Sequence, residues 1–177
     1  STITQYEYYS PLTPESVRMR DRGAPLIATM PPSALADLAW AFASAGRKAS
    51  ELCASMVAKA VATPILEFTP TSLSRLVWSF VTSWTLEPFT DIQPFLTTAA
   101  KHVATYPDGA LEPAELSRLS WALGAAGTQS AAAFAHIVSE TTRRLDAFPP
   151  TLLSDTLFGL SLSVADAGVA AAAADRD

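Results

Sequence analysis

The sequence predicts an all-α protein, and more specifically a right-handed α-solenoid of stacked helical hairpins with about seven helices. A phrase of 17 residues occurs four times, at 30–46, 68–84, 111–127 and 148–164. An aromatic residue holds the same place in every copy, and these residues lie 38, 43 and 37 positions apart: Trp40, Trp78, Trp121 and Phe158. Repeats of this length are typical of stacked helical hairpins. Alanine and leucine dominate while alternating valine and isoleucine are scarce, so little or no sheet is expected.

Each copy of the phrase carries the signals of one helix. A proline stands where the first helical residue is expected, because its missing N–H would be unbonded there anyway: Pro32, Pro70, Pro113 and Pro150. Thr69 is a suitable N-cap for the second copy. Gly46 and Gly127 are expected to end the first and third helices at the C′ position. Trp84 holds that place in the second copy, so its helix must end differently.

The phrase helix is apolar on two sides. In the first copy Leu35, Leu38 and Phe42 share one face, whereas Trp40 lies roughly 200° around the helix from Leu38. Stacking of successive repeats supplies a neighbour on each side. We therefore expect the tryptophans to lie in the core between repeats. The alternative is a ladder of indoles on which nucleic-acid bases stack.

Three regions are expected along the chain. An extended arm at 1–29 precedes the repeat array at 30–164, and an Ala-rich tail at 165–177 follows as a frayed helix or a disordered segment. Partner helices are expected between the phrases, at 50–66, 88–106 and 129–147. The array has no obvious polar cap at its C-terminal end, so the tail or a partner subunit is expected to cover an apolar face there.

Two partner helices carry further signals. Pro94 marks a kink or a late start of the second one, and the turn signal at 107–109 accounts for the long 43-residue step. The third is expected to place Phe134, Ile137, Val138 and Leu145 inward. Its charged residues are expected to point mostly outward: Glu140, Arg143 and Arg144.

Composition limits the classes of function. The 177 residues fit one domain, and no stretch approaches the roughly 18 to 20 apolar residues that span a bilayer. The net charge is −5, from 12 basic and 17 acidic residues. Because phosphate neutralisation provides much of the affinity for nucleic acid, this balance opposes tight, independent RNA binding and permits only local contacts. The single cysteine, Cys53, excludes an internal disulfide.

No catalytic or metal-binding constellation is evident. His102 and His136 occupy different repeat positions, and Cys53 has no base near it in the sequence. The segment 124–127 has the bare Gly-x-x-Gly spacing of a clamp loop, but it falls where the repeat ends its helix, and C-capping is the better explanation. We expect a non-enzyme without cofactor, metal or small-molecule substrate.

One variable position in the phrase stands out. Three residues before the aromatic residue, each copy has a charged side chain, which is acidic in two copies and basic in the other two: Asp37, Arg75, Arg118 and Asp155. This position is expected to be exposed and to form local ion pairs. In repeat proteins that read RNA, such positions contact successive bases, so Arg75 and Arg118 are the first candidates for an RNA contact, followed by Arg143 and Arg144. The N-terminal arm adds Tyr6, Tyr8 and Tyr9, which could stack on bases, and three arginines, which could meet phosphates: Arg18, Arg20 and Arg22.

The phrase resembles the repeat of the octotricopeptide family. Leu-Ala-Trp-Ala at 38–41 and Leu-Ser-Trp-Ala at 119–122 are close to the family phrase, Leu-Val-Trp-Ser at 76–79 is a fair match, and Thr-Leu-Phe-Gly at 156–159 is degenerate. These helical-repeat proteins handle RNA in mitochondria and plastids, and related arrays accompany RAP domains and FAST-kinase-like proteins. The resemblance covers 30–164, so no activity of a RAP-like domain is expected from it.

The resemblance implies an organellar function, for which three interpretations compete. The first is a non-catalytic subunit of an organellar ribonucleoprotein, most plausibly the mitochondrial ribosome, that contacts rRNA and neighbouring proteins without membrane insertion. The second is a stand-alone RNA maturation or stability factor. The third is a protein–protein scaffold in a respiratory complex. The first is favoured because it needs few basic contacts. The mitochondrial matrix is the expected location, with the chloroplast stroma as alternative, and the Ser-Thr-Ile-Thr start fits a removed targeting peptide.

Overall fold

The computed structural model describes residues 14–46, 50–86 and 91–174, where every regular element is helical, which confirms the all-α prediction for this part of the chain. Side chains at 14–21, 50–51, 84–86 and 164–174 lie outside the description. The elements in chain order are α1 (Pro14–Thr29), α2 (Pro32–Ser44), α3 (Ser50–Ala62), the 3₁₀ turn η1 (Ile65–Glu67), α4 (Pro70–Leu86), α5 (Gln93–Val103), α6 (Pro113–Ala125), α7 (Ala131–Arg143), the 3₁₀ turn η2 (Leu145–Ala147) and α8 (Pro150–Ala174).

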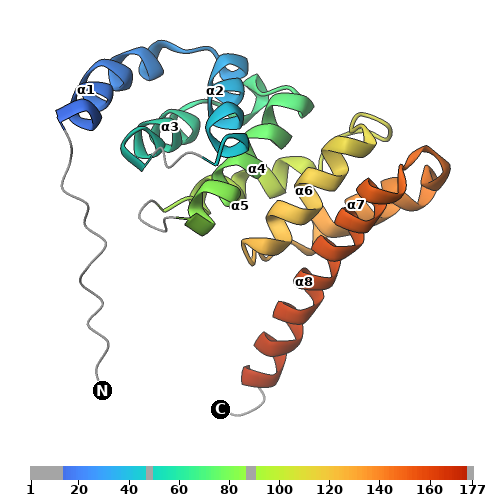
Figure 1. Ribbon diagram of the computed structural model, residues 1–177. Coiled ribbons are helices and arrows are strands. Elements are labelled where there is room, and N and C mark those ends of the chain that lie inside the picture. The colour runs from blue at the N-terminus through green and yellow to red at the C-terminus, as the bar shows by residue number, and fades with distance from the viewer. Residues whose placement is uncertain (1–13, 47–49, 87–90, 175–177) are drawn as a thin grey trace.

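The helices form two rows (Figure 1). The phrase helices α2, α4, α6 and α8 pack side by side, each against the next in this order. The partner helices form the second row, in which α1 packs against α3, α3 against α5, and α5 against α7. Between the rows, α2 contacts α3, α4 contacts α5 and α6 contacts α7, so each of these phrase helices pairs with the partner helix that follows it in the chain.

The N-terminal region corrects one prediction. The sequence predicts an extended arm at 1–29, but α1 occupies Pro14–Thr29 and packs on α3. Proline is favoured at the first helical position, and Ile27, at 1% exposure, belongs to the core. α1 thus extends the row of partner helices by one member. The described residues therefore form eight α-helices instead of about seven.

The predicted starts of the phrase helices are confirmed, and so are the ends of the first and third, whereas α4 continues to Leu86 and α8 to Ala174. All four begin at the expected prolines. Ahead of α4 the Thr69 hydroxyl oxygen accepts a hydrogen bond from the Ser72 backbone N–H at 3.2 Å. Gly46 and Gly127 follow the C-cap residues of α2 and α6 with φ of 59° and 63°. Glycine reaches these left-handed conformations without a Cβ penalty.

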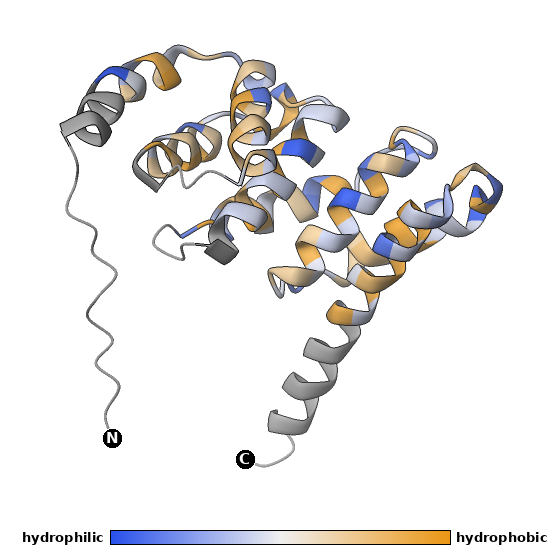
Figure 2. Ribbon diagram, viewed as in Figure 1, coloured by the Kyte–Doolittle hydropathy of each residue, from blue (hydrophilic) through white to orange (hydrophobic). Residues whose placement is uncertain are grey.

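Leucines of the phrase occupy the space between the rows. Leu35, Leu73 and Leu116, three residues after their prolines, are fully buried. They belong to one core cluster that extends from Ile27 in α1 to Phe148 before α8. Hydrophobic and hydrophilic residues alternate along the described helices (Figure 2), as expected for helices that pack on some sides and face solvent on others.

The second partner helix starts late, as Pro94 predicts. α5 begins at Gln93, with Pro94 in its first turn. The turn predicted at 107–109 is also present, and Gly109 adopts a φ of 78° there.

The third partner helix departs from the expected orientation of its side chains. Glu140 is fully buried, although the sequence predicts an outward position. Val138 and Leu145, predicted inward, are 44% and 52% exposed. The turn at 107–109 explains the burial of Glu140, because the Gly109 backbone N–H donates a hydrogen bond to Glu140 Oε2 at 2.8 Å. The inserted turn thus folds onto α7 and covers a residue that the helical pattern alone would expose.

The C-terminal region continues as helix. α8 extends from Pro150 through the Ala-rich segment to Ala174, so of the two alternatives for this region the helical one holds. In Figure 1 its C-terminal half projects beyond α6 and α7.

Candidate functional site

The three tryptophans of the phrase form a continuous row across α2, α4 and α6. The ring centroids of Trp40 and Trp78 lie 4.6 Å apart with an interplanar angle of 41°, and those of Trp78 and Trp121 lie 6.4 Å apart at 43°. These separations are typical of interacting aromatic pairs. The expectation of contact between repeats is therefore met.

The expectation that the tryptophans lie in the core is met in part, since Trp78 and Trp121 pack against the core cluster. All three side chains are half-buried, each with an accessible part. Ala39 and Ala43 flank Trp40 on its helix and are buried in the contact with α4. Because α2 approaches α4 over these small residues, no room is left for an indole between them, and the Trp40 ring lies at the edge of the interface.

Two arginines of the variable position converge on the first indole. The Cζ atom of Arg118 lies 5.0 Å from the centre of the Trp40 ring, and that of Arg75 lies 5.9 Å away. Both distances are within the range of a cation–π interaction. Arg118 belongs to α6 and Trp40 to α2, so residues two repeats apart meet at one place.

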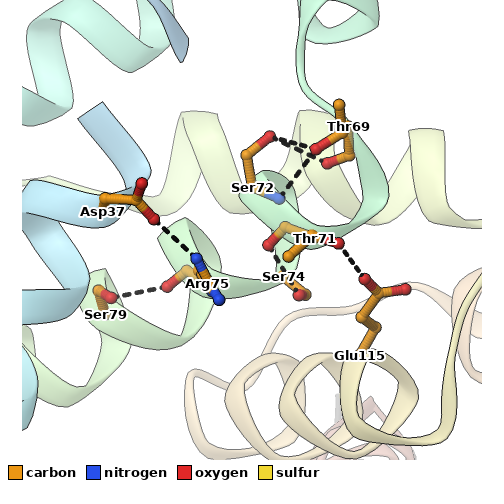
Figure 3. Close-up of polar contacts among 8 residues, drawn as sticks. All are labelled: Asp37, Thr69, Thr71, Ser72, Ser74, Arg75, Ser79 and Glu115. Carbon is orange, nitrogen blue, oxygen red and sulfur yellow. Dashed lines mark hydrogen bonds and ion pairs between the residues drawn. The ribbon is translucent and has the colours of Figure 1, made fainter. Parts of the chain in front are cut away.

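The two arginines differ in their charge partners. Arg75 Nη1 forms an ion pair with Asp37 Oδ1 at 2.7 Å (Figure 3). In the described part of the chain no carboxylate lies within ion-pair distance of Arg118. Burial lowers the pKa of Arg118 from its ordinary value, the nearby positive charge of Arg75 lowers it further, and Glu115 partly opposes this effect. Arg118 remains cationic at neutral pH because an arginine pKa starts far above it.

Arg118 and the three tryptophans border an open groove with a volume of about 470 Å³. This volume is within the range of about 300–1,000 Å³ that is common for ligand sites. The lining residues come from all four phrase helices: Trp40, Trp78, Thr82, Ala114, Ser117, Arg118, Trp121, Leu152 and Asp155. The groove therefore combines flat aromatic surfaces with one cation and one carboxylate.

Polar contacts between successive phrase helices hold the groove in shape. Thr71 of α4 donates a hydrogen bond from its hydroxyl to Glu115 Oε1 of α6 (Figure 3). The second carboxylate oxygen of Glu115 accepts from the Glu112 backbone N–H at 2.8 Å, which caps the start of α6. Because Glu115 is buried, these bonds satisfy a carboxylate that would otherwise destabilise the fold.

The other predicted arginines lie away from the groove. Arg144 donates to the Leu111 backbone oxygen at 2.6 Å and to Glu140 Oε2 at 2.8 Å. Arg143 forms ion pairs with Glu140 and Asp108, both at 2.8 Å. Both arginines thus join α7 to the segment before α6.

The N-terminal candidates are only partly described. Arg22 is exposed on α1, in the row of partner helices and not in that of the groove. The side chains of Arg18 and Arg20 lie outside the described residues, as do Tyr6, Tyr8 and Tyr9.

The remaining candidates form no site in the described residues. His102 stacks on Tyr106 with ring centroids 4.7 Å apart, and His136 and Cys53 are half-buried. No group of three or more histidine, cysteine, aspartate or glutamate residues described by the structure is arranged to hold a metal ion. No described helix is both long and apolar enough to cross a membrane.

Sequence reasoning named the charged row but missed the groove. Its place in the phrase groups Asp155 with Arg118, and the structure adds that both residues line the groove. Thr82 and Leu152 carry no signal in the sequence that could have assigned them to it. No family model matches this chain, and neither a curated protein nor a solved structure shows significant similarity to it.

Proposed function

We propose that the chain is a segment of right-handed α-solenoid that serves as a non-catalytic subunit of an organellar ribonucleoprotein, the mitochondrial ribosome. In this proposal the groove contacts single-stranded rRNA, and other surfaces contact neighbouring proteins. One observation carries the RNA contact: three accessible indoles and an arginine without a carboxylate partner line the same groove.

The chemistry of the groove suits unpaired bases. Bases stack on accessible aromatic rings whatever their sequence, because every base has a π-face, and each stacked base contributes about 1–3 kcal/mol. Arg118 lies beside the indoles with its guanidinium free to meet a phosphate. Paired bases are already stacked within a duplex, so a single-stranded or looped segment is the fitting partner.

The charge of the chain favours a role within an assembly. With a net charge of −5, the chain lacks the broad positive field that concentrates free nucleic acid. A local contact of one cation and three indoles is sufficient when other subunits position the RNA. A stand-alone maturation or stability factor would need this affinity by itself.

A protein–protein scaffold in a respiratory complex is the second candidate. It is favoured by apolar side chains exposed on the last phrase helix, Leu157 and Phe158, at 55% and 54%. A scaffold would use these surfaces and leave the groove without RNA.

Sedimentation of a mitochondrial lysate with and without RNase separates these functions. A ribosomal subunit travels with ribosomal particles and shifts after RNase. A scaffold remains in a large RNase-resistant particle, and a free factor sediments near its own 18.7 kDa. Either of the last two outcomes would overturn the proposal.

A second experiment tests the groove directly on the purified chain. Binding of single-stranded RNA is expected to quench indole fluorescence, and Arg118→Ala is expected to weaken binding about ten-fold through loss of one charge-assisted contact. Lys101→Ala is the control, because Lys101 is an exposed cation on α5, outside the groove. Equal losses for both variants would show that only diffuse charge acts.

A further inference from the structure

The four phrase helices dock in one common register. The positions 4, 7, 8 and 11 residues after the phrase proline form what we call the front face. Contacts between α6 and α8 define it: Ser120 Oγ donates to the Thr156 backbone oxygen at 2.7 Å, and a Cβ on Gly159 would meet the Ser120 backbone at 2.3 Å. The front face is therefore the side of each phrase helix that receives the next one.

The front face is covered on three helices and open on the fourth. In the first three phrase helices its residues are buried, except that each tryptophan is half-buried. They are Ala36, Ala39, Trp40 and Ala43 in α2, Ser74, Val77, Trp78 and Val81 in α4, and Ser117, Ser120, Trp121 and Gly124 in α6. In α8 all four are exposed: Ser154, Leu157, Phe158 and Ser161. The last helix thus presents the same docking surface, with two large apolar residues at its centre.

The opposite side of each phrase helix, which we call the back face, contains the positions 2, 6 and 9 residues after the proline. In α4 and α6 these residues are buried on the side of the preceding phrase helix. They are Ser72, Leu76 and Ser79 in α4, and Glu115, Leu119 and Ala122 in α6. In α2 they are open, since Ala34 and Leu38 are half-buried and Ala41 is exposed. One end of the row has an open front face and the other an open back face.

We propose that a second copy of this chain occupies the open front face, so that α2 of one copy docks on α8 of the next. Ala41 holds the position at which Ser79, Ala122 and Gly159 allow close approach of helices. The α2 back face therefore has the small residue that this docking geometry requires, and Leu38 beside it meets Leu157 and Phe158.

The row of partner helices is compatible with the same contact. Leu26 of α1 is 60% exposed and Val138 of α7 is 44% exposed, so apolar side chains are open on the first and last partner helices too. Because the two docking surfaces differ, the contact is heterologous and each added copy leaves one surface of each kind open. The proposal goes beyond the RNA contact, and self-association is measured on protein that is free of RNA.

Sedimentation equilibrium over a range of concentrations tests the proposal. The weight-average mass of the purified chain is expected to rise above 18.7 kDa with concentration and to show no plateau at the dimer. Leu157→Glu and Ala41→Arg are each expected to lower the association constant at least about ten-fold, because each puts a charge into an apolar contact. Both residues are exposed, so circular dichroism should show native helix content in each variant.

A mixture of the two variants provides the decisive test of which surfaces dock. Leu157→Glu keeps an intact α2 back face, and Ala41→Arg keeps an intact α8 front face, so an equimolar mixture should form a dimer that does not extend. Leu66→Glu is the matched control, since Leu66 is 80% exposed in η1, on neither docking face, and should associate as the wild type does. The proposal is overturned by a wild-type mass of 18.7 kDa at all concentrations, by a mixture that stays monomeric, or by self-association that Ala41→Arg leaves unchanged.

Discussion

A Cβ atom on Gly124 would lie 2.2 Å from the backbone oxygen of Gly159, so the backbones of α6 and α8 touch where the two helices cross. A residue with little or no side chain follows the aromatic residue in every copy of the phrase: Ala41, Ser79, Ala122 and Gly159. The fourth copy has the smallest of them, a glycine, where the backbones of α6 and α8 touch. Its departure from the phrase, Thr-Leu-Phe-Gly, therefore has a packing reason.

Replacement of Gly159 by alanine should destabilise the chain. The new Cβ would lie 2.3 Å from the Ser120 carbonyl group, and backbone atoms cannot move aside as a flexible side chain can. Overpacking of this kind costs about 1–3 kcal/mol, which exceeds the gain of up to about 1 kcal/mol from alanine in a helix. Urea denaturation measures the difference in the free energy of unfolding.

Ser154→Ala on the same helix is the control for this substitution. Ser154 is exposed, so the change should alter stability by no more than about 0.5 kcal/mol. A Gly159→Ala variant as stable as the wild type would contradict the close crossing of α6 and α8.

The carboxylate of Glu140 should be a strong determinant of stability. It is fully buried and binds Arg144, Arg143 and the Gly109 backbone N–H. Glu140→Ala leaves the half-buried Arg144 without its carboxylate, and loss of one partner of a buried pair costs about 3–5 kcal/mol. The melting temperature and urea denaturation both report this loss. Asp108→Asn is the contrasting change: the Asp108 side chain is 73% exposed, so loss of its ion pair with Arg143 should cost less than about 1 kcal/mol.

Tyr106 should make the fold sensitive to alkali. Burial raises the pKa of its phenol above the ordinary value of 10.0, and the negative charge of Glu115 raises it further. The unfolded chain therefore loses this proton at a lower pH than the folded chain, so this contribution to stability is complete at neutral pH and declines as pH rises above about 10.

Tyr106→Phe should remove this alkaline component without a loss at neutral pH. The Tyr106 hydroxyl oxygen is buried and has no hydrogen-bond partner in the described residues, so its removal should leave stability unchanged or raise it by up to about 1 kcal/mol. Unfolding curves of both proteins at pH values from neutral to alkaline measure the effect. Parallel declines for wild type and variant would refute the assignment to Tyr106.

Asp37→Asn should strengthen RNA binding if the groove contacts phosphate as proposed. The change releases Arg75 from its ion pair and adds a second free cation beside Trp40. We expect affinity for a single-stranded oligonucleotide to rise about three-fold, with a steeper salt dependence. Stability should fall by less than about 1 kcal/mol, because both side chains of the pair are partly exposed. An affinity that is unchanged or lower would count against a role for Arg75 beside Trp40 in RNA binding.

The sequence alone was sufficient to place the starts of the four phrase helices. A proline at the first turn, a hydroxyl cap such as Thr69 and a glycine such as Gly46 act within one or two turns of the chain, so their effects can be read locally. The repeated leucines identified the core for the same reason, since helical spacing assigns them to one face.

Only the tertiary structure decided what depends on contacts between distant segments. Arg118 meets Trp40 because α2, α4 and α6 pack side by side, which no local signal encodes. Glu140 is buried because an inserted turn folds over α7. Trp40 lies at the edge of its interface because the neighbouring small residues Ala39 and Ala43 bring α2 and α4 close together. Local propensity determines where helices begin and end, whereas the groove and the open ends of the array follow from how whole helices pack.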